Sequence, residues 1–255
     1  MIFVMDVGNT QTTVALFEGE KLLHSWRLTT ARHRTQDEWG ALLMNLFHVH
    51  DLSMRDVAGV AICSVVPPAD SPLRLMVRRY FGPEPLFIQP GTKTGIHVLY
   101  DSPGDVGADR IVNAVAAYAA YDAPAIVVDF GTATTFDMLG DGGNYLGGVI
   151  APGLGISAEA LFEKTAKLPK VEVARPRKVI GRTTVGSMQS GLYWGYIGLV
   201  EGILKRMKKE FGTVKTVVAT GGLAGVLMAD CPSIDAVDEN LTLTGLRILY
   251  ERNQG

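Results

Sequence analysis

Two stretches of the chain carry the same succession of residue types. "VMDVGNTQTTVALF" (4–17) and "VVDFGTATTFDML" (127–139) each contain an apolar run, an Asp-x-Gly step, a cluster of small polar residues and a second apolar run. After a buried strand, an Asp-x-Gly step predicts a tight turn, in which glycine permits positive φ and lets a ligand approach the backbone. We call these two segments the first Asp-Gly turn (6–13) and the second Asp-Gly turn (129–135).

The residues of both turns are suited to binding phosphate. Hydroxyl, amide and backbone N–H groups in such a turn donate to phosphate oxygens. The side chains in question are Asn9, Thr10, Thr12 and Thr13 in the first turn, and Thr132, Thr134 and Thr135 in the second. A carboxylate needs a cation between itself and phosphate, so Asp6 and Asp129 predict bound metal. A polar hairpin turn would explain either copy alone, but the repetition favours a nucleotide site.

A third motif, "VVATGGLAG" (217–225), places the glycine pair Gly221 and Gly222 after an apolar strand. Glycine at this point predicts that the backbone passes close to a flat ligand. A glycine pair is a weak signal by itself. Two Asp-x-Gly turns followed by Thr-Gly-Gly, in this order, are typical of the actin-like ATPase and sugar kinase superfamily, in which the last motif receives adenosine.

"GADR" (107–110) supplies a candidate general base. Phosphoryl transfer to an alcohol needs positioning, charge neutralisation and a group that takes the hydroxyl proton. Asp109, immediately before the expected helix "IVNAVAAYAAY" (111–121), is that candidate. Arg110 would bind a substrate carboxylate or the transferring phosphoryl group. The alternative is structural: an aspartate that complements a helix dipole beside a solvated arginine.

The elements that would position these residues are those of an α/β protein. Apolar runs predict strands at 2–6, 13–17, 22–28, 57–64, 85–89, 125–129, 135–139, 145–150 and 214–220. A helix is expected after Thr35, with Glu38 completing a capping box, and another over 68–81. The repetition indicates a duplicated domain, 1–122 and 123–255, hinged near 121–125 with a cleft between the copies.

Composition restricts the function classes. A net charge of −2 and a pI near 6.2 provide no general attraction to nucleic acid or anionic membranes, so neither is expected as a partner. The sequence contains no apolar run of transmembrane length and its start does not resemble a signal peptide. Cys63 and Cys231 are expected to be buried, reduced thiols, which fits a cytoplasmic protein. His48 and His50 lie near Asp51 without further ligands nearby, which argues against a metal site there.

Within the superfamily, the chain resembles type III pantothenate kinase along essentially its whole length. The motifs that carry the resemblance are "DVGNTQTT" (6–13), "GADR" (107–110), "DFGTATT" (129–135), "GGVIAPG" (147–153), "RTTVGSMQSG" (182–191) and "ATGGLA" (219–224). GADR followed about twenty residues later by DFGTATT is the specific combination. The resemblance implies two ribonuclease-H-like domains of the actin-like ATPase type. It also implies ATP-dependent phosphorylation of pantothenate to 4'-phosphopantothenate, the first step of coenzyme A biosynthesis.

The resemblance also implies roles for individual positions. Asp109 is the catalytic base; Asp129 binds a monovalent cation, K⁺ or NH4⁺; Asp6 holds the Mg²⁺ of ATP, directly or through water. ATP is bound by Asp6, Val7, Gly8, Asn9, Thr10, Gln11, Thr12, Thr13, Thr132, Gly221 and Gly222. Pantothenate is bound by Tyr100, Gly107, Ala108, Asp109, Arg110 and Thr184. A homodimer is implied, with Thr184 contributed across the interface.

Other functions fit less well. Gly153-x-Gly155-x-x-Ala158 partly matches a dinucleotide fingerprint, but Pro152 intrudes at the turn. No Walker-A P-loop occurs. A non-catalytic regulator on the same fold, or an ATP hydrolase, remains an alternative; the retention of three carboxylates argues against a regulator.

One segment adds something that the motifs do not contain. The stretch 163–184 has seven basic residues against two glutamates: Lys164, Lys167, Lys170, Arg175, Arg177, Lys178 and Arg182 against Glu163 and Glu172. We expect this basic segment at a dimer interface or cleft edge, where Arg175, Arg177 and Lys178 would attract two anionic substrates. A solvated loop is the alternative.

Overall fold

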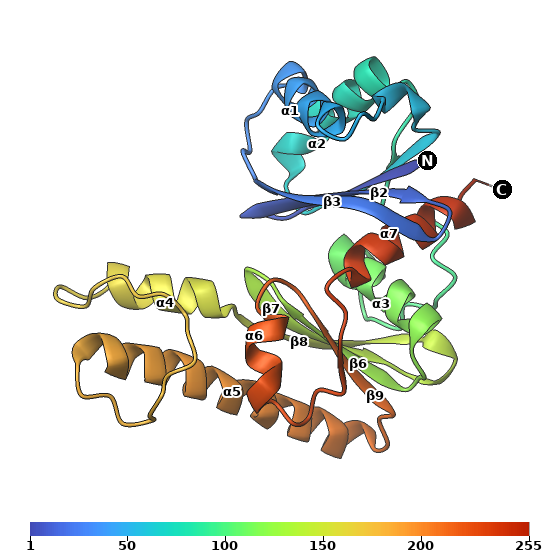
Figure 1. The fold of residues 1–255 in the computed structure, drawn as a ribbon. Helices are drawn as coiled ribbons and strands as arrows, with labels where there is room; N and C mark the ends of the chain where they lie inside the picture. Colours follow the sequence, from blue (N-terminus) through green and yellow to red (C-terminus); the bar gives the residue numbers. More distant parts are fainter. Residues whose placement is uncertain (255) are drawn as a thin grey trace. The chain divides into compact units, whose positions relative to one another are not determined.

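The computed structural model of the chain describes residues 1–254, which fall into two compact units. The first unit comprises Met1–Gly95, Asp101–Ala116 and the residues from Leu241 onward; the second comprises Ile96–Tyr100 and Ala117–Asn240. The units differ from the predicted contiguous halves 1–122 and 123–255. The reason is that the C-terminal helix α7 (Leu241–Arg252), which the sequence analysis did not anticipate, packs against strands of the first sheet (Figure 1).

The two sheets have the same topology, which confirms the predicted duplication. The strand order in the first unit is β3-β2-β1-β4-β5, and in the second it is β8-β7-β6-β9-β10. In each sheet the first three strands are antiparallel neighbours and the last two run parallel to the central strand. The strands are β1 (Ile2–Val7), β2 (Gln11–Glu18), β3 (Lys21–Thr29), β4 (Gly59–Ser64), β5 (Leu86–Phe87), β6 (Ala125–Phe130), β7 (Ala133–Leu139), β8 (Tyr145–Pro152), β9 (Thr216–Thr220) and β10 (Ala236–Val237).

The helices of the first unit are α1 (Gln36–His48), α2 (Pro67–Met76), the first nine residues of α3 (Ala108–Ala120) and α7. Short 3₁₀ turns lie at Met54–Asp56 and Pro103–Asp105, and a π-helical turn at Val77–Phe81 extends α2. The helix predicted over 68–81 therefore has two parts. One face of the sheet packs with α1 and α2 in a core that includes Phe3, Met5, Trp39, Leu43 and Leu73.

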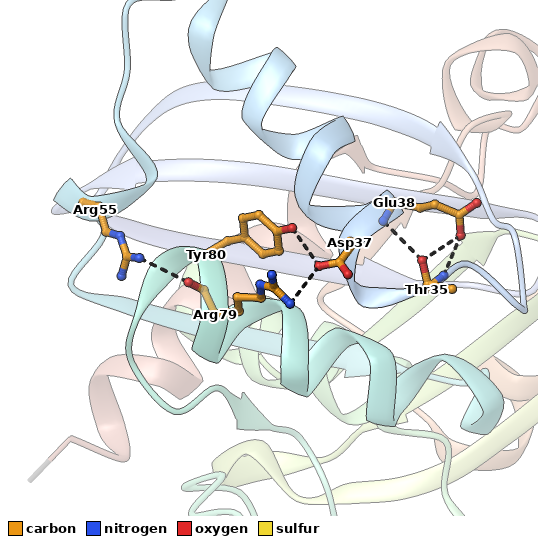
Figure 2. Close-up of polar contacts among 6 residues, drawn as sticks. All are labelled: Thr35, Asp37, Glu38, Arg55, Arg79 and Tyr80. Carbon is orange, nitrogen blue, oxygen red and sulfur yellow. Dashed lines mark hydrogen bonds and ion pairs between the residues drawn. The ribbon is translucent and has the colours of Figure 1, made fainter.

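The predicted capping box of α1 is present. The Thr35 hydroxyl accepts from the Glu38 N–H at 3.3 Å, and the Glu38 carboxylate accepts from the Thr35 N–H at 2.7 Å (Figure 2). The hydrogen bond from the Thr35 N–H, and a second from the Thr35 hydroxyl at 3.0 Å, lower the pKa of the Glu38 carboxyl. Asp37, next to the box, accepts from the Tyr80 hydroxyl at 2.8 Å, which ties α1 to the turn that follows α2 (Figure 2). The start of α1 is thus fixed both locally and by tertiary contact.

The helices of the second unit are α4 (Leu154–Glu163), α5 (Thr184–Phe211), α6 (Ala224–Leu227) and the last residues of α3; 3₁₀ turns lie at Asp141–Gly143 and Met228–Asp230. The 28-residue helix α5 supplies much of the core against β6, β7 and β9. Its core residues include Tyr193, Tyr196, Val200 and Leu204. In the part of the chain that the structure describes, no helix is both long and apolar enough to span a membrane.

Candidate active site

The first Asp-Gly turn joins β1 to β2 in the first unit. Asp6, the last-but-one residue of β1, lies opposite Thr13 on β2 and Cys63 on β4. The Gly8 N–H donates to the Gln11 carbonyl at 3.0 Å, and a Cβ at Gly8 would lie only 2.9 Å from the same oxygen. Glycine is therefore required here by this close approach. The predicted reason, a positive φ, is wrong for both turns, because neither Gly8 nor Gly131 is among the glycines with positive φ. Asn9, between these two residues, is exposed.

Hydrogen bonds of Thr12 and Thr30 on the buried side of this turn hold its backbone in place. The Thr12 side chain is fully buried, and its hydroxyl lies 2.8 Å from that of Thr30. The Thr30 hydroxyl donates to the Gly8 carbonyl at 2.7 Å, and the Thr30 N–H donates to the Thr10 carbonyl at 3.1 Å. In this geometry the Thr12 hydroxyl faces the protein and contacts Thr30. Sequence reasoning missed Thr30, which is distant in sequence from every recognised motif.

Asp109 lies in the first turn of α3, and not before the helix as expected. Its Oδ1 accepts from the N–H of Arg110 at 2.8 Å. A Cβ at Gly107 would lie 2.6 Å from that same oxygen, so glycine there lets the carboxylate fold back over the backbone. Arg110 is only 7% exposed, which makes it a buried cation and not the solvated neighbour of the structural alternative.

The pKa of the Cys63 thiol shows which carboxylates lie close to this end of β4. Burial raises the pKa of the Cys63 thiol well above its ordinary value, and the negative charges of Asp6, Asp109 and Asp70 raise it further. The first unit therefore brings the predicted metal-binding aspartate and the predicted base into one neighbourhood. Both cysteines are free and buried, as expected.

Asp70 is a third carboxylate in this neighbourhood that sequence reasoning did not select. It lies in the first turn of α2, and its Oδ1 is buried without a hydrogen-bond partner among the described residues. The segment "SVVPPAD" could have indicated this carboxylate. In it, two prolines typical of a helix start follow a buried strand, and Asp70 comes in the first turn of the helix.

The second Asp-Gly turn joins β6 to β7 in the second unit and repeats this arrangement. Asp129 lies opposite Thr135 on β7 and Thr220 on β9. The Gly131 N–H donates to the Ala133 carbonyl at 3.1 Å. The turn is shorter than the first by one residue, because Gly8 bonds to the third residue beyond it and Gly131 to the second.

The hydroxyls of this turn have different surroundings. Thr134 is 1% exposed, and its hydroxyl is hydrogen-bonded to that of Tyr196. Thr135 donates to Asp137 Oδ2 at 3.0 Å. The expectation that both donate to phosphate is therefore corrected, since protein groups take their protons. Thr132, the predicted ATP contact, is exposed at the tip of the turn.

Gly221 and Gly222 have unlike environments. Gly221 has φ +90°, and a Cβ there would lie 2.7 Å from Asp129 Oδ1 and 2.7 Å from the Phe130 carbonyl oxygen. Its lack of a side chain leaves room beside two oxygen atoms, a carboxylate and a carbonyl. A Cβ at Gly222, by contrast, would meet no atom within 4 Å. The sequence predicted that the backbone here passes close to a flat ligand. In the structure, the Gly221 backbone passes close to the second Asp-Gly turn.

Tyr100 and Thr184, two predicted substrate contacts, belong to the second unit. Tyr100 is 38% exposed; its ring centroid lies 6.4 Å from that of Tyr145. Tyr145 in turn donates to Asp137 Oδ1 at 2.8 Å. Thr184 is the exposed first residue of α5, next to Thr183, whose hydroxyl accepts from the Gly186 N–H at 3.1 Å. Thr184 therefore lies at a helix N-terminus, which favours anions.

The basic segment 163–184 is irregular after α4, and Arg175 within it is held by the protein itself. The Arg175 guanidinium contacts both oxygens of Asp230, and the Tyr193 hydroxyl donates to Asp230 Oδ2 at 2.7 Å. Arg175 lowers the pKa of the Asp230 carboxyl to about 2, while burial raises the pKa of Tyr193 to about 12. This corrects the expectation for Arg175, whose charge is locally balanced. Arg177 and Lys178 are exposed.

The described residues offer small sets of oxygen atoms as candidate metal ligands. Within residues 1–254 there is no group of three or more His, Cys, Asp and Glu side chains arranged to hold an ion. The room left by Gly221 beside Asp129 and the Phe130 carbonyl is a cradle of two oxygens, and hard cations prefer such oxygen donors.

Comparison with known proteins identifies the family. The pattern of the type III pantothenate kinase family matches residues 2–206. Type III pantothenate kinases of Myxococcus xanthus and Koribacter versatilis are 54% and 53% identical to the chain, covering 99% and 100% of it and 99% and 96% of their own lengths. The chain belongs to the type III pantothenate kinase family.

Solved structures agree at the level of the fold. A Sinorhizobium meliloti protein assigned as a 2-dehydro-3-deoxygalactonokinase superposes with a TM-score of 0.62 at 12% identity, over 99% of this chain and 97% of its own. The expected duplicated α/β fold is confirmed, and this solved structure has the same fold.

Proposed function

We propose a division of roles among these residues for the reaction of this pantothenate kinase. The chain transfers the γ-phosphoryl group of ATP to pantothenate and forms 4'-phosphopantothenate, the first step of coenzyme A biosynthesis. The single observation that supports the assignment best is the pair of Asp-Gly turns at equivalent places in the two sheets, with Asp109 in the neighbourhood of Asp6. A coupled ADP-release assay with ATP, run with and without pantothenate, tests it. ADP release that is independent of pantothenate would indicate a hydrolase, and no release would indicate a regulator.

Asp109 is the general base in this proposal. Only one of its oxygens, Oδ1, is held by the Arg110 N–H, which orients the carboxylate at the start of α3. The other oxygen then accepts the proton of the pantothenate hydroxyl as phosphoryl transfer proceeds. Arg110, buried beside it, supplies positive charge for the pantothenate carboxylate or for the phosphoryl group.

The two Asp-Gly turns and the glycine pair bind ATP. The exposed residues of the first turn, Asn9, Thr10 and Gln11, present side chains and backbone N–H groups to phosphate oxygens. Val7, Gly8, Thr12 and Thr13 shape that turn, and Thr132 plays the donor role in the second. Gly221 and Gly222 carry the backbone past adenosine, and the open space beside Gly222 suits a flat ring.

The cations are assigned to the two aspartates that end strands β1 and β6. Asp6 would hold the Mg²⁺ of ATP, directly or through water, and Asp129 with the Phe130 carbonyl would hold K⁺ or NH4⁺ in the cradle that Gly221 leaves. When bound, these ions neutralise phosphate charge. The protein's own contribution is to keep the two carboxylates fixed at strand ends.

Pantothenate is bound by Tyr100, by the 107–110 segment and by Thr184 in this proposal. Thr184 at the N-terminus of α5 favours the substrate carboxylate, through its hydroxyl and through the helix dipole. We assign it to the site of the neighbouring subunit in a homodimer. Exposed apolar side chains support such an interface: Val179, Ile180 and Val185 close in sequence to this helix start, and Ile156 and Phe162 on α4, of which Ile180 is 84% exposed.

Subunit mixing tests this assignment. An Asp109→Asn subunit paired with a Thr184→Val subunit contains one intact site only if Thr184 serves its partner. Random mixing should then restore about a quarter of the wild-type activity, since half of the dimers are mixed and each has one working site. Activity no higher than that of the separate variants would place Thr184 in its own subunit's site. Sedimentation of Ile180→Asp, expected to be monomeric, tests the interface.

The surroundings of the two cysteines bear on the compartment. Cys63 and Cys231 are buried free thiols, and burial raises the pKa of the Cys231 thiol to about 12. Such thiols stay reduced in the cytoplasm, which we propose as the location of the enzyme.

A further inference from the structure

Both Asp-Gly turns are fastened by two corresponding hydrogen bonds, a backbone N–H to a turn carbonyl and a pair of hydroxyls, although the turns lie in different units. In the first, the N–H of Thr30, just after β3, donates to the Thr10 carbonyl at 3.1 Å. In the second, the N–H of Gly153, just after β8, donates to the Thr132 carbonyl at 3.1 Å. Because β3 and β8 hold equivalent places in their sheets, Thr30 and Gly153 are equivalent positions.

A buried threonine bonded to a second hydroxyl lies beneath each turn. Thr12 and Thr134 occupy equivalent places, since Thr12 pairs with Val7 and Thr134 with Phe130, the residues that follow the two aspartates. Each has 1% exposure or less. The Thr12 hydroxyl bonds to that of Thr30, and the Thr134 hydroxyl bonds to that of Tyr196 on α5.

The direction of these bonds follows from counting protons. A hydroxyl has one proton to donate. Thr30 gives its proton to the Gly8 carbonyl at 2.7 Å, and Tyr196 gives its proton to the Pro152 carbonyl at 3.2 Å. Burial raises the pKa of the Tyr196 phenol, so this group keeps its proton. Thr12 and Thr134 must therefore be the donors within each hydroxyl pair.

The second hydroxyl comes from different elements in the two units. Thr30 supplies it in the first unit, directly after a strand. Gly153 cannot carry a side chain at the equivalent position, because its Cβ would lie 2.1 Å from the Thr132 carbonyl oxygen. Tyr196 supplies the missing hydroxyl from the middle of α5 instead. The two unrelated residues, Thr30 and Tyr196, share one role, since each accepts from the buried threonine of its turn. Their own protons go to different places, that of Thr30 to Gly8 within the turn and that of Tyr196 to Pro152 at the end of β8. The shared role indicates that each turn requires an acceptor for its buried threonine.

We propose that Thr30 and Tyr196 are positioning residues, which set the backbone of the two Asp-Gly turns for phosphoryl transfer. This inference rests on the proposed function of the turns in binding ATP. Neither residue touches ATP in this proposal; each acts through the threonine and the carbonyl that it bonds. Loss of either hydroxyl leaves a buried hydroxyl and a turn or strand-end carbonyl without a partner, and the turn shifts to satisfy them.

Thr30→Val and Tyr196→Phe test the proposal, because each removes one hydroxyl and nearly preserves shape. We expect kcat/KM for ATP to fall by about tenfold in each variant, as expected when a transition-state contact of roughly one hydrogen bond is misplaced. The Kd of Mg-ATP should rise in parallel, and KM for pantothenate should stay near the wild-type value. Thr30→Ser, which restores the hydroxyl, should recover most of the activity.

Matched controls lie close by. Thr29→Val makes the same change at an exposed residue of β3. Tyr193→Phe removes another hydroxyl of α5, one that bonds Asp230 and the Val226 carbonyl. Tyr193→Phe should lower the melting temperature and leave kcat/KM for ATP unchanged, which separates loss of stability from loss of positioning.

The outcomes are distinguishable from those of the proposed function. If the wild-type enzyme forms 4'-phosphopantothenate and Thr30→Val and Tyr196→Phe retain its kcat/KM for ATP, the positioning role is refuted. Suppose that Thr30→Val or Tyr196→Phe lowers the melting temperature as much as Tyr193→Phe does. If its kcat/KM for ATP then falls no further than that of Tyr193→Phe, the role of the hydroxyl is structural and the proposal also fails. A wild-type protein inactive with pantothenate would overturn the proposed function alone; the Kd of Mg-ATP then decides the positioning role.

Discussion

Gly221→Ala is the substitution whose effect follows most directly from the geometry. Gly221 combines φ +90° with a Cβ position that lies 2.7 Å from both Asp129 Oδ1 and the Phe130 carbonyl oxygen. The first feature strains any L-residue, and the second forces the second Asp-Gly turn to move. Both neighbours belong to the cradle that we assign to the monovalent cation, so stability and cation dependence should change together.

The two costs can be added. A left-handed backbone costs an L-residue about 1–2 kcal/mol. Overpacking against groups that cannot rotate away costs about 1–3 kcal/mol. The sum, about 2–5 kcal/mol, corresponds to a fall in melting temperature on the order of 10 °C for a chain of this size. In addition, the displaced carboxylate should weaken activation by K⁺.

Melting followed by circular dichroism and ADP release in K⁺ and Na⁺ buffers measure both effects. Gly222→Ala is the control for stability, since its Cβ would meet no atom within 4 Å. We expect it to change the free energy of unfolding by less than about 1 kcal/mol. Gly221→Ala with wild-type melting and wild-type activation by K⁺ would refute the reasoning about this close approach.

Four further outcomes are expected. Asp109→Asn should lower kcat by roughly 10² or more with little change in melting temperature; near-normal turnover would remove it as the base. Activity should be much higher in K⁺ or NH4⁺ than in Na⁺, and Asp129→Ala should abolish the difference; equal rates in all three buffers would argue against the site. The Asp230 carboxyl, with its pKa depressed from 3.8 to about 2, contributes stability that is complete above its unfolded pKa and lost as the pH falls through about 2. Asp230→Asn should therefore melt earlier near neutral pH and lose less stability between about pH 4 and pH 2; a wild-type acid profile would contradict this. Replacing Arg177 and Lys178 with Gln should raise KM for the anionic substrates more at low than at high ionic strength, and salt-independent KM values would make them solvated residues only.

Local signals account for what the sequence predicted correctly. The capping box of α1 needs only Thr35 and Glu38, three residues apart, and it forms as expected. The Asp-x-Gly steps likewise specify their turns through adjacent residues, and the strands found around them differ from the predicted bounds by only a few residues. The duplication was visible for the same reason.

Contacts between distant segments account for what was missed. Thr30 and Tyr196 bond to residues 18 and 62 positions away, and Arg175 meets Asp230 across 55 positions. No spacing rule connects such pairs. The burial of the Thr12 and Thr134 side chains was not predictable either, because the residues beside a phosphate motif do not show which hydroxyls face the core.

The position of α7 has a consequence for synthesis on the ribosome. Its side chains Leu241, Leu246 and Leu249 are fully buried against the first unit, and a Cβ at Gly59 on β4 would clash with Tyr250. The first unit therefore lacks one covering layer until α7 has left the exit tunnel, although its sheet is translated first. The second unit has all its residues by Asn240. The unit whose sheet is translated first is thus completed after the other unit, and the nascent chain carries an apolar sheet face that stays uncovered until α7 emerges.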